Sequence, residues 1–154
     1  MRVLPRFFII ILLSACSQQD ATGPGEVRWD QETCARCSMA VSDRMFTAQV
    51  RGGEAGGVTK LYKFDDIGCA VIWLDLQQWK DDPRTEIWVT DYRNGQWINA
   101  EKAWYVTGRN TPMGYGLGAQ PSAEEGLLNF AKAKEHILMI EKTEHVHGGG
   151  HVHN

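Results

Sequence analysis

Two short segments in the middle of the chain, residues 46–51 and 58–64, have the composition of strands, and a Gly-rich stretch joins them; apolar and polar residues alternate along the first. This pattern predicts a β-hairpin. The next residues, 67–79, carry apolar side chains at helical spacing, and Asp65 or Asp66 can cap the helix that this spacing predicts. We therefore expect a hairpin followed by a helix.

A second hairpin is predicted by residues 86–92 and 96–99, which flank the dipeptide Asn94-Gly95. Asn-Gly favours the positive φ angles of the tight turn that joins two antiparallel strands. Strand pairing is expected to resume at residues 104–106, where Trp, Tyr and Val follow one another.

In the remaining part of the domain, residues 108–140, the sequence predicts a flexible stretch, a helix and a last strand. Residues 108–120 are rich in glycine, and Ser122 and Glu125 have the spacing of a capping box for a helix through Lys134. The apolar residues 137–140 suit a strand. The order hairpin, helix, hairpin, helix predicts an α+β domain of two similar hairpin-plus-helix halves.

The first residues have the features of an export signal. Arg2 and Arg6 precede the apolar residues 7–13, a run too short for a membrane-spanning helix, which needs about 20 residues. Residues 13–16 resemble the bacterial lipobox, in which the cysteine, here Cys16, becomes the lipidated first residue. We therefore predict a lipoprotein of the cell envelope that faces the periplasm, with the outer membrane as the expected location.

Four parts follow along the chain: a signal peptide at 1–15, a lipidated tether at 16–27, a folded metal-binding domain at 28–142 and a His-rich tail at 143–154. The 154 residues, 43% of them hydrophobic, suffice for one folded core. Sixteen basic and 19 acidic residues give a formal net charge of −3. Because no basic block is present, nucleic acid is not expected as a partner.

Two thiols and a thioether lie close together at Cys34, Cys37 and Met39. Thiolate and thioether sulfur are polarisable ligands that favour Cu(I), and methionine is not among the usual ligands of zinc. Metal ligation is the favoured interpretation of this motif. A disulfide and a redox-active pair are the alternatives.

Once Cys16 is lipidated, three thiols remain, so that at least one of Cys34, Cys37 and Cys69 stays unpaired. Cys69 lies on the apolar side of the predicted helix, where a buried small apolar residue is the favoured role. Met113 is a further candidate ligand, because the glycines around it let the backbone bring its thioether over a metal held by the cysteines.

The C-terminal segment carries four histidines as two His-Val-His units on either side of a Gly hinge, at His145, His147, His151 and His153. Imidazole nitrogen binds Cu(II), Zn(II) and Ni(II), so the tail is a candidate accessory metal site. An expression tag is the alternative explanation of this segment.

Together these features resemble the NosL family, lipoprotein copper chaperones associated with nitrous oxide reductase. The resemblance covers about residues 13–140. It rests on an ordered set of motifs: the lipobox Leu13-Ser14-Ala15-Cys16, then Cys34-x-x-Cys37-x-Met39, then Phe64-Asp65-Asp66-Ile67-Gly68-Cys69, then Pro112-Met113-Gly114.

The resemblance implies an α+β fold of two related halves, similar to that of organomercurial lyase. It also implies a carrier without enzymatic activity, which delivers Cu(I) across the periplasm to copper-site assembly machinery that includes an ABC-type complex. Cys37 and Met39 match the family's Cys-x-Met motif, Met113 matches its later Met, and Cys34 matches a first Cys. The His-rich tail lies outside the shared motifs.

Two other functions would use the same part of the chain. A thiol-disulfide oxidoreductase acting on metal-site cysteines would use the Cys-x-x-Cys pair. A site that cleaves carbon–mercury bonds would use Cys34, Cys37, Cys69 and Asp65 or Asp66. Met39 and Met113 favour the copper carrier, because thioethers bind Cu(I) and have no part in disulfide exchange.

Overall fold

The computed structural model describes residues 21–124 and 127–148, with side chains described as far as residue 143, and has an α+β architecture. No helix in these residues is long and apolar enough to cross a membrane. The signal peptide, Cys16, Glu125, His151 and His153 lie outside the described residues, as do the side chains of His145 and His147. The elements are β1 (Ala48–Gly52), β2 (Lys60–Phe64), α1 (Ile67–Asp75), β3 (Glu86–Thr90), β4 (Trp97–Asn99), β5 (Trp104–Val106), β6 (Gly118–Gln120) and α2 (Phe130–Gly148).

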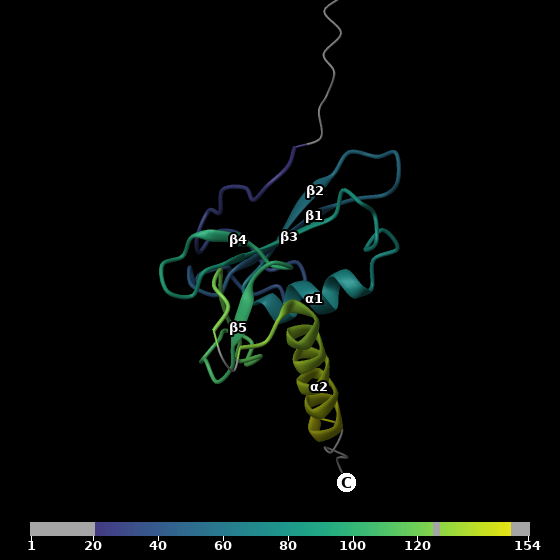
Figure 1. The fold of residues 1–154 in the computed structure, drawn as a ribbon. Coiled ribbons are helices and arrows are strands. Elements are labelled where there is room, and N and C mark those ends of the chain that lie inside the picture. The colour runs from purple at the N-terminus through teal and green to yellow at the C-terminus, as the bar shows by residue number, and fades with distance from the viewer. Residues whose placement is uncertain (1–20, 125–126, 149–154) are drawn as a thin grey trace, which may run out of the picture.

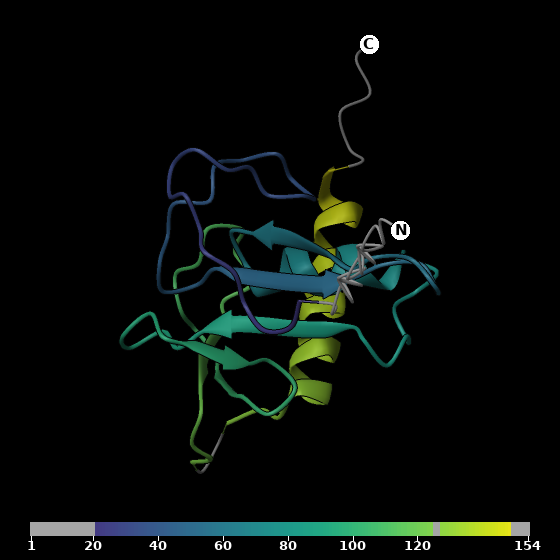
Figure 2. The ribbon, with the colours of Figure 1, turned by 90° about the horizontal axis from the view of Figure 1, so that it is seen from above.

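Four antiparallel strands form the main sheet in the order β2-β1-β3-β4 (Figure 1 and Figure 2). Strand β1 pairs with β2 on one side and with β3 on the other, so that Val50 lies opposite both Tyr62 and Ile87. Both predicted hairpins are confirmed, as β1–β2 and β3–β4. They lie side by side in one sheet, and the similarity of two halves stays a prediction.

One face of this sheet packs against the helices, and the N-terminal segment covers the other (Figure 2). Phe64 is fully buried on the helix side, where its ring centroid lies 5.3 Å from that of Trp73 in α1. On the opposite face, the buried Gln49 amide donates to the Gly25 carbonyl and accepts from the Gly25 N–H. Residues 16–27 were predicted to be a tether, and the end of this segment, at Gly25, is therefore bound to the sheet.

Helix α1 is shorter than predicted. The sequence suggests a helix as far as residue 79, whereas α1 ends at Asp75. The N–H groups of Gln77 and Lys80 bond to carbonyls three residues back, so the chain continues in tight turns instead of an α-helix. These turns bring Trp79 against Tyr62 of β2, with ring centroids 5.9 Å apart.

Strands β5 and β6 form a separate two-stranded sheet. The strand predicted at residues 104–106 is confirmed, but it does not continue the second hairpin. Its partner β6 lies within residues 108–120, so the prediction that this stretch is flexible is wrong. Tyr115, Leu117 and Ala119 are buried in the core, and this burial orders a Gly-rich segment.

Helix α2 starts later and continues farther than predicted. Its first turn is capped by Asn129, whose side-chain oxygen accepts the N–H three residues on at 3.0 Å. Ser122, the predicted cap, lies in an irregular segment. The prediction of a strand at residues 137–140 is wrong, because these residues belong to α2. Ala133 and Ile137 are both fully buried, at the spacing of one helix face.

Replacement of Asn129 with Ala should lower the free energy of unfolding by about 1 kcal/mol, because it removes the acceptor that caps the first turn of α2. Ser122→Ala is the matched control and should change this free energy by less than about 0.5 kcal/mol. Urea denaturation of the reduced protein measures both. A larger loss from Ser122→Ala than from Asn129→Ala would contradict the observed start of the helix.

Candidate metal centre

A short loop positions two of the candidate sulfur ligands. The Cys34 N–H donates to the Met39 carbonyl at 2.8 Å, and the Ser38 N–H donates to the Cys34 carbonyl at 3.0 Å. Ser38 has a φ of 64°, in the left-handed region, which lets the chain reverse within a few residues. The Ala35 N–H donates to the Lys63 carbonyl at 2.9 Å, which holds this loop against the end of β2.

The junction of β2 and α1 positions two further side chains. Asp65 directly follows β2, and Cys69 lies in the first turn of α1. Between them, Asp66 caps the helix, with its Oδ1 accepting from the Gly68 N–H at 2.8 Å. This cap fixes where α1 begins and therefore where the Cys69 side chain leaves the helix.

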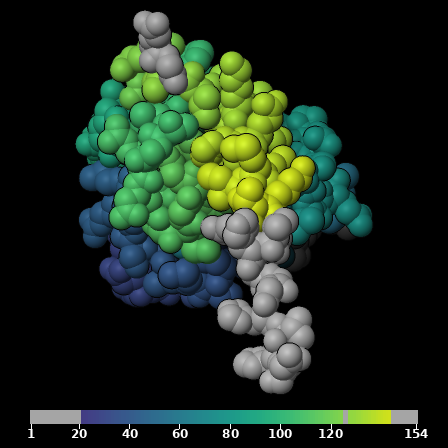
Figure 3. Space-filling view, turned by 90° about the horizontal axis from the view of Figure 1, so that it is seen from below, coloured from purple at the N-terminus to yellow at the C-terminus, as the bar shows by residue number. Residues whose placement is uncertain are grey.

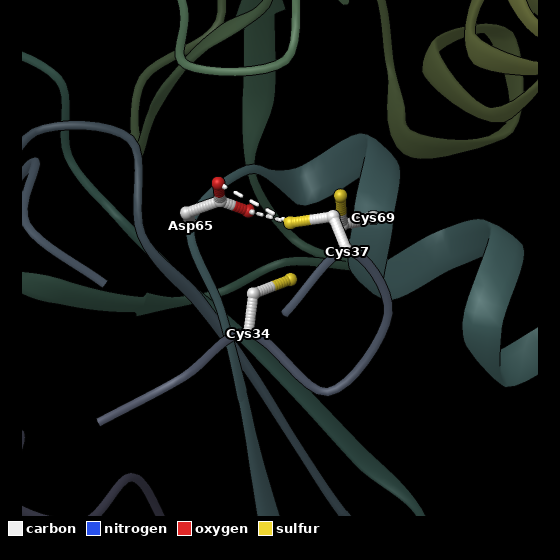
Figure 4. Close-up of side chains that lie close together, drawn as sticks. All are labelled: Cys34, Cys37, Asp65 and Cys69. Atoms are coloured by element: carbon white, nitrogen blue, oxygen red, sulfur yellow. Dashed lines mark hydrogen bonds between the residues drawn. The ribbon is translucent and has the colours of Figure 1, made fainter. Parts of the chain in front are cut away.

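Cys34, Cys37, Asp65 and Cys69 converge into one group, the thiol cluster (Figure 4). One ligand atom from each side chain lies within 4.8 Å of the ligand atoms of the other three. The Cys37 thiol donates to the two Asp65 oxygens at 3.5 and 3.6 Å. Cys34, Asp65 and Cys69 are buried and Cys37 is partly exposed, so the cluster has a closed interior and one accessible side.

Hydrogen bonds and burial shift the pKa values of the three thiols in different directions. A hydrogen bond donated by the Cys69 thiol lowers the pKa of Cys34 to about 4, and the backbone N–H groups of Cys37, Asp65 and Arg36 add to this effect. The same bond to Cys34 raises the pKa of Cys69. Burial raises the pKa of Cys37 to about 11 and that of Asp65 to about 6. These shifts favour the thiolate form at Cys34 and the thiol form at Cys37 and Cys69.

An ionic network closes the inner side of the thiol cluster. The Arg36 guanidinium donates to Cys69 Sγ at 3.8 Å and to the Tyr115 hydroxyl at 3.0 Å, and it pairs with Glu141 of α2. Tyr115 also donates to Glu141 at 2.6 Å. The Tyr115 ring lies over Gly68, where a Cβ atom would come within 2.2 Å of it. The green segment before β6 and the yellow helix α2 accordingly lie together in Figure 3.

The sequence-based copper ligand set omits one sulfur of the cluster. The favoured role of Cys69 was a buried apolar residue, and only the alternative mercury site grouped it with Cys34 and Cys37; the residue is fully buried, and its sulfur lies beside those of both. The odd number of thiols and the acidic pair Asp65-Asp66 just before the helix were the signals available in the sequence. All three thiols are free in the structure.

The two candidate methionines differ in exposure. Met39, two residues after Cys37, is 53% exposed. Met113 is partly buried against the core, and its N–H donates to Asp66 Oδ2 at 3.3 Å, which ties its loop to the start of α1. Ligation by Met39 and Met113 stays a prediction. Positions 145 and 147 of the His-rich tail belong to the last turns of α2.

Three sulfur atoms and one carboxylate suit a soft metal ion, whereas hard cations take oxygen ligands. Metals bind the thiolate form of cysteine, so binding at this cluster would release protons from Cys37 and Cys69. Among the residues that the structure describes, this is the one group of at least three Cys, His, Asp or Glu side chains close enough to share an ion.

The charge distribution predicts a pH-dependent thiolate signal. Absorbance at the thiolate band should show one thiolate in the reduced, metal-free protein at neutral pH, lost as the pH falls toward about 4. Because the pKa of Cys34 is lowered on folding, its contribution to stability is fully present above the ordinary thiol pKa of about 8.5 and is lost with falling pH. Cys34→Ser should abolish the neutral-pH signal, and Cys37→Ser should retain it. A wild-type signal that appears only above the ordinary thiol pKa would contradict this assignment.

Comparison with known proteins gives one family. A model of the NosL family matches residues 28–138 of the chain. A similar solved structure is that of the copper chaperone NosL from Shewanella denitrificans, with a TM-score of 0.45, 16% sequence identity and coverage of 77% of this chain and 89% of that chain. No curated protein matches the sequence. Because the family match spans more than half of the chain, the protein belongs to the NosL family.

Proposed function

We propose that this protein is a periplasmic copper chaperone, which binds Cu(I) at the thiol cluster and delivers it for assembly of the copper sites of nitrous oxide reductase. The observation that carries the proposal is the convergence of Cys34, Cys37 and Cys69 within 4.8 Å. Membership of the NosL family supports it. The coordinating residues of the proposal are Cys37, Met39, Met113 and Cys34.

The donor set favours Cu(I) over zinc and over redox chemistry. Cu(I) is a soft ion that takes thiolate and thioether ligands, and thioethers are not among the usual ligands of zinc. A thiol-disulfide oxidoreductase needs a thiolate that can reach the sulfur of a partner. Cys34, the thiol whose pKa is lowered, is only 2% exposed.

Transfer of the ion is proposed to occur by ligand exchange at the accessible side of the cluster. Cys37 is partly exposed and Met39 is 53% exposed, so a sulfur ligand of a partner can approach the copper there. A low-coordinate Cu(I) accepts the incoming ligand before it releases one of its own. The copper is therefore always bound, although no single site holds it irreversibly.

The terminal segments have proposed roles in location and capture. Lipidation at Cys16 would anchor the protein in the envelope, facing the periplasm, within reach of an ABC-type assembly complex. The histidines of the tail, His145, His147, His151 and His153, would collect Cu(II), Zn(II) or Ni(II) as an accessory site. Cys16 and the tail are proposed to act outside the thiol cluster.

A second candidate, cleavage of carbon–mercury bonds, is favoured by one specific observation. Asp65 lies 3.5 Å from the Cys37 thiol, within the same cluster as Cys34 and Cys69. In such a reaction thiolates hold the mercury and an acid protonates the departing carbon, and a carboxyl with a pKa of about 6 fits the acid. Release of benzene from phenylmercury by the reduced protein would support this function. Tight Cu(I) binding without such release supports the chaperone.

Substitution of the coordinating sulfurs tests the copper proposal. Cys37→Ser replaces a soft thiolate by a hard hydroxyl and should weaken Cu(I) binding by at least about a hundredfold. Met39→Leu and Met113→Leu nearly conserve volume and should each weaken it by about tenfold, or about 1.4 kcal/mol. Anaerobic competition with a Cu(I) chelator measures these affinities.

The matched control is Met139→Leu, since Met139 is 59% exposed on α2 and has no part in the proposed site. Its Cu(I) affinity should equal that of the wild type. Unchanged affinity in Cys37→Ser would show that copper does not bind at the thiol cluster. Equal losses in Met139→Leu and Met39→Leu would remove Met39 from the ligand set.

A further inference from the structure

The sulfur atoms of the thiol cluster and its loop differ in their access to solvent. Cys34 and Cys69 are 2% and 0% exposed, whereas Cys37 is partly exposed and Met39 is 53% exposed. The exposure of Cys37 is thus between that of the closed pair of sulfurs and that of Met39, two residues farther along the chain. A ligand set of Cys37, Met39, Met113 and Cys34 leaves Cys69 without a role, although its sulfur is as close as the others.

We propose that Cys69 completes an enclosed three-sulfur copper site with Cys34 and Cys37, and that Cys37 passes the ion between this site and an exchange position shared with Met39. The inference rests on the proposed function, because it takes Cu(I) as the ion. It adds a third thiolate ligand, and it assigns the storage of copper to the enclosed site and its transfer to the exchange position. Both positions use Cys37, so copper moves between them without leaving the protein.

The separations among the sulfurs fit such a site. Thiolate–metal bonds in proteins are about 2.3 Å long, so three thiolates around one ion in a plane lie about 4 Å from one another. The sulfurs of Cys34, Cys37 and Cys69 already lie within 4.8 Å of one another. Side-chain adjustments of under about 1 Å would bring all three into contact with one ion, and the fold need not change.

Arg36, which also pairs with Glu141, offsets part of the charge that a third thiolate adds. Three thiolates around a monovalent ion form an anionic complex, which burial disfavours unless a cation lies close. The Arg36 guanidinium lies 3.8 Å from Cys69 Sγ and keeps its charge at physiological pH, and Glu141 of α2 holds it in place. Asp65 lies within 4.8 Å of all three sulfurs and accepts from the Cys37 thiol, and its carboxylate attracts an incoming cation.

The two positions would divide the work of a carrier. In the enclosed site, three thiolates and burial protect Cu(I) from competing ligands and slow its loss. At the exchange position, Cys37 and the exposed Met39 present the ion to a partner. Loss of Cys69 should therefore speed the release of copper, while loss of Met39 should slow its transfer.

X-ray absorption and capture kinetics test this inference on the reduced, copper-loaded protein. The extended fine structure at the copper edge should show three sulfur ligands in the wild type. Cys69→Ala and Cys69→Ser should each have one fewer and should lose copper to bathocuproine disulfonate faster by at least about tenfold. Met139→Leu is the matched control and should change neither the ligand number nor the rate.

The possible outcomes separate this inference from the proposed function. If the wild type binds no Cu(I), the proposed function itself fails. If copper binds tightly with two sulfur ligands, or if both Cys69 variants match the wild type in ligand number and rate, the enclosed site is wrong and the chaperone proposal stands. Circular dichroism checks the fold of the variants. Should neither variant fold, Met39→Leu and Met113→Leu decide: three sulfur ligands retained in both support Cys34, Cys37 and Cys69 as the ligands, and the loss of one in either contradicts the enclosed site.

Discussion

The buried carboxylate of Asp66 is the group on which the arrangement of the site depends. It is 1% exposed and accepts hydrogen bonds from the Gly68 N–H, the Thr111 hydroxyl and the Met113 N–H. Burial raises the pKa of Asp66, and these donors act in the opposite direction. A buried carboxylate is tolerated where donors surround it. This one fixes both the start of the helix that carries Cys69 and the loop that carries Met113.

The sequence pattern of neighbouring residues accounts for the elements that were predicted correctly. Tertiary packing accounts for the elements that were not. Both hairpins follow from short strand-like segments and from the glycines between them, in the stretch 52–57 and at Gly95, which are properties of neighbouring residues. In contrast, residues 137–140 suit a strand by composition, and burial of Ile137 together with Ala133 makes them helical. The sequence did not predict strand β6 because its segment is rich in glycine, which indicates flexibility. Only the tertiary structure shows that Tyr115, Leu117 and Ala119 are buried there.

The same division applies to the candidate site. Cys34 and Cys37 lie three residues apart, so their spacing alone indicated a shared role. Cys69 comes from another element, and its proximity depends on the Ala35–Lys63 hydrogen bond that holds the loop at the end of β2. No pattern among neighbouring residues predicts the contact between the Cys34–Cys37 loop and the end of β2. The sequence therefore predicts the Cys34–Cys37 pair of the site, and the tertiary fold adds Cys69 to it.

The proposed carrier function depends on the binding of Cu(I) inside the thiol cluster. The most direct measurement is a crystal structure of the reduced protein with one equivalent of Cu(I), with diffraction recorded on both sides of the copper absorption edge. One strong anomalous peak is expected within bonding distance of Cys37 Sγ, on the side that faces Cys34 and Cys69. A copper peak held only by histidines of the tail, with none among the three sulfurs, would contradict it.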